Sequence, residues 1–280
     1  MNLNKTYTVP TVLSIAGFDG SGGAGIQADT KTISALGCYA MNVLTALPVQ
    51  NTQGVRNIFD IPTQAIKEQL ACIFDDIYPD AIKIGMVHSV SLVEIISDFL
   101  KNYKGTIIFD PVMISTSGHQ LIQDETIQAC IELLFPLATL ITPNLDEASV
   151  LVKEKVDSVE KMEKAGYKIL ESSCNAILVK GGHLEAPILT SLLIDKQHSV
   201  QKFNSMRINT NNTHGSGCSL SSAIASYMAQ GLNLSKAVEY GLDYVHEAIR
   251  SSKDLKIGQG NGPLNHFHNP QKLIINEMDR

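Results

Sequence analysis

The segment Asn209-Thr210-Asn211-Asn212-Thr213-His214-Gly215-Ser216-Gly217-Cys218-Ser219-Leu220 joins a polar turn to an apolar helical pattern. Apolar residues recur at helical spacing from Leu220 to Met228, so we predict that Gly215 to Cys218 form the first turn of a helix. The first amides of a helix lack internal partners, and the helix dipole is positive there. Because glycines leave these amides open to an anion, the segment predicts a site at which a phosphoryl group is transferred.

A thiol, Cys218, lies inside this turn, where the helix N-terminus is expected to favour its thiolate. A single cysteine is more often a small buried apolar side chain, but the setting favours a chemical role. Cys218 would act as general base on a substrate hydroxyl or help to position the phosphoryl group. Gly215, Ser216 and Gly217 would supply amides to the phosphoryl oxygens, where charge develops in the transition state.

The composition limits the classes of protein. The chain has 280 residues, 44% of them apolar, which is enough for one large core. A net charge of −6 without a Lys/Arg cluster argues against nucleic acid or an anionic membrane as partner. No apolar run reaches the roughly 18 residues of a membrane span, and residues 1–9 lack the apolar core of a secretion signal. Five widely spaced cysteines without a CxxC pair predict a reduced, cytoplasmic protein, with all except Cys218 buried.

Short apolar runs alternate with helical patterns along the whole chain. The predicted strands are 11–16, 38–49 as one strand or a strand pair, 81–85, 106–109, 139–142 and 176–180, followed by a hairpin over 188–195 and 199–203. The predicted helices are one after residue 25 and others over 62–74, 92–100, 124–134, 145–152, 158–171, one after residue 218, and 235–251. This order predicts an α/β fold with a mostly parallel central sheet and helices on both faces. Because no linker or repeat interrupts it, we expect a single domain over 1–280, with a flap near 112–121.

Ligands of such folds bind beyond the carboxyl ends of the strands. The loops that leave those ends are polar and rich in glycine or aspartate: 17–25, 50–54, 85–88, 110–118, 143–147 and 181–183. The loop 17–25 (GFDGSGGAG) has neither GxGxxG spacing nor a GK[ST] motif. A loop that brings backbone close to a small substrate is therefore at least as good an interpretation as a nucleotide site.

Four polar residues in these loops have a structural and a functional interpretation. Asn144 and Glu147 fit a helix capping box, or, beside a phosphate site, a role in binding Mg²⁺. Lys180 ends an apolar strand and either extends to solvent or faces phosphate. Asp110 before Pro111 either shapes a turn or orients a metal or substrate. The residues alone leave these alternatives open.

Taken together, eight segments resemble the hydroxymethylpyrimidine/phosphomethylpyrimidine kinases of thiamine biosynthesis, in the ribokinase-like superfamily. They are AGFDGSGGAGIQAD (16–29), TALPVQNTQGV (45–55), KIGM (83–86), DPVM (110–113), ITPNLDEA (141–148), VKGGH (179–183), NTNNTHGSGCSL (209–220) and GQGNGPLNHFH (258–268). The last segment favours this branch over the sister pyridoxal kinases. The resemblance implies a ribokinase-like three-layer sandwich and a homodimer.

The resemblance also implies two ATP-dependent phosphorylations. The first is on the hydroxymethyl oxygen of 4-amino-5-hydroxymethyl-2-methylpyrimidine, and the second converts the monophosphate to the diphosphate. The alternative is a pyridoxal or pyridoxine kinase. A binding protein that has lost phosphoryl transfer and a generic sugar kinase are less consistent with the residues.

By resemblance, individual residues take the family's roles. The positions matching the pyrimidine pocket are Gly17, Asp19, Gln50, Met86 and Val112. The positions matching ATP phosphate and Mg²⁺ binding are Lys180, Asn144, Thr213, Gly215 and Gly217 for phosphate, and Glu147 with Asp110 for the metal. Cys218 matches the catalytic cysteine, where other ribokinase-like enzymes carry aspartate. The chain departs from the usual Gly-Ser-Asp-Ser start, because Phe18 and Gly20 replace the two serines.

Overall fold

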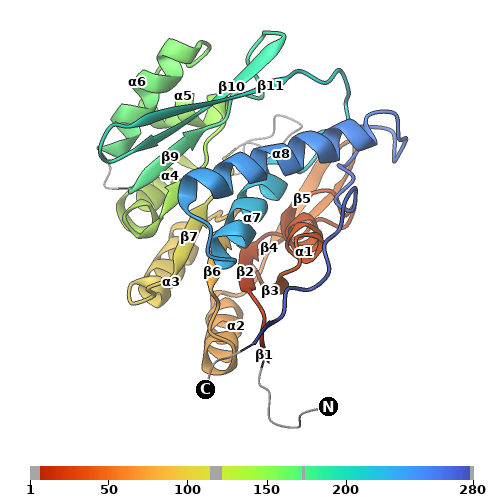
Figure 1. Ribbon diagram of the computed structural model, residues 1–280. Helices are drawn as coiled ribbons and strands as arrows, with labels where there is room; N and C mark the ends of the chain where they lie inside the picture. The colour runs from red at the N-terminus through yellow and green to blue at the C-terminus, as the bar shows by residue number, and fades with distance from the viewer. Residues whose placement is uncertain (1–6, 114–121, 172–173, 278–280) are drawn as a thin grey trace.

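A computed structural model describes residues 7–113, 122–171 and 174–277. Among these residues, an eight-stranded sheet forms the centre of the molecule (Figure 1). In spatial order its strands are β11 (Val200–Met206), β10 (Ile188–Asp195), β9 (Ala176–Val179), β8 (Leu140–Ile141), β7 (Thr106–Phe109), β6 (Ala81–Ile84), β2 (Thr11–Ala16) and β3 (Tyr39–Leu44). Neighbours from β3 to β9 are parallel, and only β10 and β11 add antiparallel pairs. The predicted mostly parallel sheet and the predicted hairpin are confirmed.

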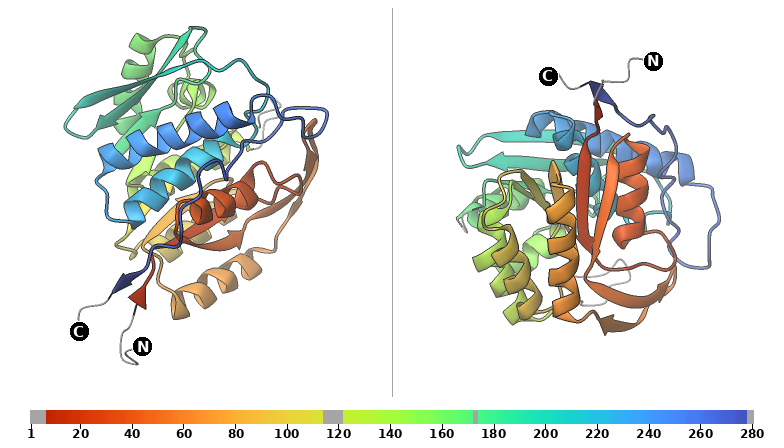
Figure 2. Two further views of the ribbon diagram at one scale, coloured as in Figure 1. Left: turned by 45° about the vertical axis from the view of Figure 1, so that its right-hand side comes forward. Right: turned by 90° about the horizontal axis from the view of Figure 1, so that it is seen from below.

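Helices cover both faces of this sheet, as the views in Figures 1 and 2 show. One face carries α1 (Gly25–Ala35), α7 (Ser216–Ala229) and α8 (Leu234–Ser252). The other face carries α2 (Thr63–Asp76), α3 (Val90–Leu100), α4 (Asp124–Ala129) with its short extensions η1 (Cys130–Leu134) and η2 (Phe135–Leu137), α5 (Leu145–Val152) and α6 (Val159–Leu170). The three layers are those predicted from the alternating pattern.

The strands are continuously apolar because both faces of the sheet are buried. In β2, Leu13 and Ile15 join the core under α2 and α3, whereas Val12 joins the core under α1, α7 and α8. In β6, Ile82 and Ile84 belong to the first core and Ala81 to the second. Lys83 shares the face of Ala81 and is fully buried toward α1 and α7.

One part of the fold differs from the expectation. Residues 50–54 were expected to follow a strand of the sheet, but they form the tip of a separate antiparallel hairpin, β4 (Ala46–Asn51) with β5 (Gly54–Asp60). The pattern did not predict β5, because only one face of the hairpin is covered and Val49 and Phe59 remain exposed. Cys72 on α2 is also exposed, not buried as expected.

Three further features concern the ends of the chain, the predicted flap and the helices. The strands β1 (Tyr7–Thr8) and β12 (Asn276–Glu277) pair with each other, so the described ends of the chain lie side by side. Residues 114–121 of the predicted flap lie outside the described part of the chain. None of the helices in the described ranges combines the length and hydropathy needed to cross a bilayer.

Candidate active site

The carboxyl ends of the parallel strands bring the predicted loops to one edge of the sheet. The segments that leave this edge are 17–24 after β2, 85–89 after β6, 110–113 after β7, 142–144 after β8 and 180–187 after β9. Because strands β2, β6, β7, β8 and β9 are consecutive neighbours, these segments lie next to one another. The first turn of α7 contributes the remaining part of the site.

Helix α7 begins where the sequence predicted, with Gly215 as its N-cap at φ 82°. A Cβ atom at Gly215 would lie 1.7 Å from the carbonyl oxygen of Gly23, so the turn and the glycine-rich loop touch through backbone. The Ser216 amide donates to the Thr213 carbonyl at 3.1 Å. Within the described residues, the amides of Gly217 and Cys218 have no recorded backbone acceptor, which leaves two donors for an anion.

A cluster of charged side chains lies beside this turn. Lys180 Nζ is 2.7 Å from Asp110 Oδ1 and 3.8 Å from Glu147 Oε2. A Cβ atom at Gly217 would lie 3.3 Å from Lys180 Nζ and 3.4 Å from Asp110 Oδ2. The structure therefore brings Lys180, Asp110 and Glu147 together beside the first turn of α7.

The two carboxyl groups of this cluster are buried, and their charge exceeds that of Lys180. Burial alone would raise the pKa of Asp110, but Lys180 and Lys83 outweigh it and the pKa is lowered. Burial raises the pKa of Glu147, against the opposing effect of Lys180. The carboxyl groups of Asp110 and Glu147 are hard oxygen ligands that share one ammonium group, that of Lys180. They fit a Mg²⁺ ion whose remaining ligands are phosphate oxygens and water. The described residues contain no group of three or more His, Cys, Asp or Glu side chains that could hold a metal.

Asn144 and Glu147 also form the capping box that the sequence left open. The Asn144 side chain accepts from the Glu147 amide at 2.9 Å, and Glu147 Oε2 accepts from the Asn144 amide at 2.7 Å. The cap fixes the Glu147 carboxyl group at the start of α5, close to Lys180. Capping and metal binding are therefore compatible roles for this residue.

The expectation that the helix start favours a Cys218 thiolate is wrong for the protein without ligands. Burial raises the pKa of the Cys218 thiol to about 11, although Lys83 and the Gly25 amide lower it. The side chain keeps an intermediate exposure, so it is reachable from the site. Desolvation exceeds the effect of the helix terminus here, and the thiol is neutral near pH 7.

The glycine-rich loop is organised around Asp19, which is fully buried. Its carboxylate accepts from the amides of Ser21, Gly23 and Ala24 at 2.7–3.0 Å. His214 Nε2 lies 2.9 Å from Asp19 Oδ2 and ties this loop to the turn before α7. Asp19, predicted to bind substrate, thus has both carboxylate oxygens engaged within the chain. The sequence predicted no role for His214.

The predicted substrate residues are only partly assembled. A Cβ atom at Gly17 would lie 3.3 Å from Met86 Sδ, and the Met86 carbonyl accepts from Thr45 Oγ1 at 2.8 Å. Val112 is half-buried and follows Asp110 by two residues. Gln50 lies on β4 at an irregularity in the pairing, with a partly exposed side chain. In the described part of the chain, no hydrogen bond joins Gln50 to the other predicted residues.

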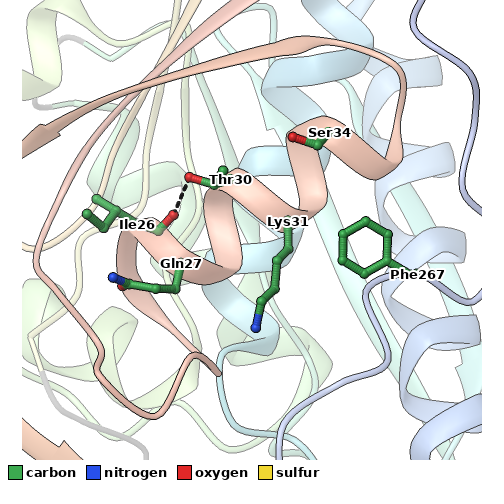
Figure 3. Close-up of a pocket in the computed structure, with 6 residues that line it drawn as sticks. All are labelled: Ile26, Gln27, Thr30, Lys31, Ser34 and Phe267. Atoms are coloured by element: carbon green, nitrogen blue, oxygen red, sulfur yellow. Dashed lines mark hydrogen bonds between the residues drawn. The ribbon is translucent and has the colours of Figure 1, made fainter.

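Two further observations concern α1 and the loop before it. The Phe18 ring fills the space beside Gly20, where a Cβ atom would lie 3.3 Å from Phe18 Cε1. A hollow of about 310 Å³ opens on the outer side of α1, next to Phe267 (Figure 3). From α1, Gln27 accepts from the Asp19 amide at 2.8 Å, and Lys31 donates to the Gly22 carbonyl at 2.7 Å. No predicted catalytic residue lines the hollow.

A buried pair that the sequence did not assign lies below the site. Lys83 on β6 and Asp29 on α1 are both fully buried, with Nζ 2.8 Å from Asp29 Oδ2. Lysine is almost never fully buried unless paired. A lysine in the middle of the apolar strand 81–84 was the signal available in the sequence.

The family model for phosphomethylpyrimidine kinase matches residues 19–265. The chain belongs to the phosphomethylpyrimidine kinase family. Membership confirms the predicted family, and with it a kinase, a phosphotransferase of the ribokinase-like fold. A hydroxymethylpyrimidine/phosphomethylpyrimidine kinase of Rhizobium meliloti (strain 1021) is 43% identical over 257 residues, which are 91% of this chain and 96% of the relative. The chain spans only 54% of a fused relative, the thiamine biosynthesis bifunctional protein of Geobacter sulfurreducens.

Solved structures agree with this family assignment. A phosphomethylpyrimidine kinase of Clostridium difficile 630 superposes with a TM-score of 0.76 at 41% identity, over 86% of this chain and 99% of that one. An ADP complex of Bacillus subtilis pyridoxal kinase gives a TM-score of 0.85 at 34% identity, over 92% of this chain and 98% of that one. Phosphomethylpyrimidine kinases and pyridoxal kinases share this fold, so the fold alone does not indicate which substrate is phosphorylated.

Proposed function

We propose that this phosphomethylpyrimidine kinase family member transfers the γ-phosphoryl group of ATP to the hydroxymethyl oxygen of 4-amino-5-hydroxymethyl-2-methylpyrimidine. It then phosphorylates the monophosphate to the diphosphate, as a step of thiamine biosynthesis. The observation that carries the proposal is the meeting of Lys180 and Asp110 with Gly217 and Cys218 at the start of α7. The name of the Rhizobium meliloti relative supplies the substrate class.

The chain's own groups have distinct tasks in this transfer. The amides of Gly217 and Cys218 bind the phosphoryl oxygens on which charge develops, and Lys180 offsets charge on the donor phosphates. Asn144 and Thr213 border the ATP phosphates. Together, Asp110 and Glu147 would hold Mg²⁺, which, when bound, neutralises phosphate charge.

Cys218 acts mainly as a positioning group in this proposal. Phosphoryl transfer through a loose transition state needs little proton removal at the start, so catalysis rests on placement and electrostatics. A thiol whose pKa is raised to about 11 is a poor base at neutral pH. Of the two roles that the sequence left open, burial therefore favours positioning.

The acceptor side is formed by Gly17, Met86 and Val112, with Gln50 on the hairpin contributing hydrogen bonds to the pyrimidine. The loop held by Asp19 brings backbone to the substrate. A second candidate function is phosphorylation of pyridoxal, because the Bacillus subtilis pyridoxal kinase superposes with a TM-score of 0.85.

The test is a substrate panel with coupled detection of ADP: hydroxymethylpyrimidine, its monophosphate, pyridoxal and ribose, each with MgATP. We expect turnover of the first two. Turnover of pyridoxal alone would transfer the assignment to pyridoxal kinase, and thermal stabilisation by ligand without ADP release would indicate a binding protein. We expect Cys218→Ala to lower kcat more than ATP affinity, whereas Cys72→Ala, at an exposed thiol on α2, serves as the matched control.

We also propose one domain over 1–280, a homodimer and a cytoplasmic location. The exposed apolar side chains of the β4–β5 hairpin, Leu47, Val49 and Phe59, are compatible with a contact between copies. An exposed free thiol, Cys72, is compatible with a reducing compartment. Light scattering coupled to size exclusion measures the mass in solution, and a monomeric mass would contradict the dimer.

A further inference from the structure

The ion pair of Lys83 and Asp29 joins β6 to α1 inside the molecule. Both side chains are fully buried, and Lys83 Nζ lies 3.0 and 2.8 Å from the two carboxylate oxygens. Buried ion pairs can often be replaced by apolar side chains without loss of stability. The position of the pair in the site is therefore the feature to explain.

Asp29 is held from several elements at once. Ser14 Oγ on β2 donates to Asp29 Oδ2 at 2.5 Å, and Ser222 Oγ on α7 donates to Asp29 Oδ1 at 2.8 Å. With two contacts from Lys83, each carboxylate oxygen has two donors, so its orientation is fixed. Ser222 follows Cys218 by four residues, which places the network one helical turn below the thiol.

The ammonium group of Lys83 lies at the floor of the site. A Cβ atom at Gly85 would be 2.7 Å from Lys83 Nζ, and Gly85 directly precedes Met86 of the acceptor side. After burial, which raises the pKa of the Cys218 thiol, Lys83 has the largest effect and lowers it. Lys83 Nζ and Ser222 Oγ both donate to Asp29 Oδ1, which places the ammonium group beside α7, one helical turn from Cys218.

Other charged groups also act on Cys218. Asp110 follows β7 and raises the pKa of the thiol, as Asp29 on α1 does. Lys180, at the end of β9, also interacts with the thiol, and it is bonded to Asp110, which is proposed to hold Mg²⁺. Lys180 faces the side proposed for ATP phosphates, whereas Lys83 lies under the turn. Lys83 is therefore the cation that is free of any proposed ligand contact.

We propose that Lys83 is a positioning residue for phosphoryl transfer: fixed by Asp29, its ammonium keeps a permanent positive charge beneath Cys218 and the first turn of α7. This charge stabilises negative charge that develops above it without touching the substrate. The inference rests on the proposed role of Cys218 and its turn in the transfer.

The main variant is Lys83→Met with Asp29→Asn, because removal of one charge would leave the other buried and unpaired. Ser226→Ala is the matched control, since Ser226 is buried on the same helix and its hydroxyl donates only to the Ser222 carbonyl. Thermal melts followed by circular dichroism establish that each variant is folded.

The first measurement is alkylation by iodoacetamide between pH 7.5 and 10, with each cysteine followed by peptide mass spectrometry. The exposed Cys72 serves as internal reference. In the double variant, alkylation of Cys218 relative to Cys72 should fall about tenfold, because a nearby charge shifts a thiol pKa by on the order of one unit. The single variant Asp29→Asn should change it in the opposite direction, toward faster alkylation of Cys218.

The second measurement is the kinetics of hydroxymethylpyrimidine phosphorylation. We expect kcat of the double variant to fall about tenfold or more while KM for ATP changes less than about threefold, as for a group that acts on the transition state. Unchanged alkylation of Cys218 in folded double and Asp29→Asn variants, or an unchanged kcat, would overturn the proposal. If the wild-type protein does not phosphorylate hydroxymethylpyrimidine, the proposed function fails, but the alkylation ratio still decides whether Lys83 acts on Cys218.

Discussion

Replacement of Gly217 by alanine should separate activity from stability. A Cβ atom at this position would lie 3.3 Å from Lys180 Nζ and 3.4 Å from Asp110 Oδ2, so it fits with at most a small shift of the Lys180 side chain. Gly217 is inside α7 and has no positive φ. Alanine in a helix is about 0.5–1 kcal/mol more favourable than glycine. We therefore expect Gly217→Ala to leave the melting temperature unchanged or to raise it.

The same methyl group would occupy the space between the helix amides and Lys180, where the transferred phosphoryl group is proposed to bind. Alanine keeps the amide, but its methyl group would block the approach of the phosphoryl oxygens, and loss of one preorganised donor contact in such a site reduces kcat by about 10²–10³-fold. Coupled ADP detection with hydroxymethylpyrimidine and MgATP measures this loss. The matched control is Gly182→Ala, since a Cβ at Gly182 has no described atom within 4 Å; it should keep the wild-type kcat.

Two outcomes would refute this reasoning. A Gly217→Ala variant with kcat within about threefold of wild type would show that the first turn of α7 does not bind the phosphoryl group. A variant that loses kcat together with several kcal/mol of stability would show that the Cβ disturbs the fold and not the anion. The control shows what a glycine-to-alanine change does at a position where the added methyl group meets no described atom.

Two further predictions concern packing and pH. Gly20→Ser should lower the free energy of unfolding by about 1 kcal/mol, because the new side chain crowds the Phe18 ring. In a Phe18→Ser background the same change should cost nearly nothing. Additive costs in a double-mutant cycle, measured by chemical denaturation, would contradict the contact. Burial lowers the pKa of His266 from 6.5 to about 4, so the folded protein keeps it neutral and stability falls as the pH drops through this interval. The loss should approach about 3 kcal/mol and be smaller in His266→Asn; equal pH dependence of both proteins in chemical denaturation would refute this.

The fold was predictable because its signal is periodic and local. Continuous apolar runs such as 11–16 and 106–109 require a sheet covered on both faces, and the structure confirms this. The β4–β5 hairpin was predicted only in part: residues 46–49 of β4 lie within the predicted strand or strand pair 38–49, and only one face of the hairpin is covered. Its second strand, 54–60, has little buried surface to mark it.

The positions of site residues were predictable where the residue directly follows a parallel strand. They were not predictable where they depend on a contact between residues far apart in the sequence. Lys180 follows β9 and Asp110 follows β7, and only β8 lies between these two parallel strands. The two side chains therefore come close at the same edge of the sheet. The contact of His214 with Asp19 joins residues 195 positions apart, and no local pattern predicts it. The protonation state of the Cys218 thiol was also not predictable from the sequence, because desolvation depends on the atoms that pack around the thiol and not on its position in the helix.

The charges around α7 give a reason for a thiol at residue 218. The groups near this turn include the ammonium groups of buried Lys83 and partly buried Lys180, and the buried carboxyl groups of Asp29, Asp110 and Glu147. When all are ionised, negative charge exceeds positive charge by one, which suits a cation brought with the phosphate donor. A carboxylate at residue 218 would double this excess of negative charge beside the turn that is proposed to bind an anion. It would also compete with Asp29 for Lys83. A neutral thiol fills the position without that repulsion, so the turn proposed to bind phosphate and the carboxyl groups proposed to hold Mg²⁺ can lie side by side.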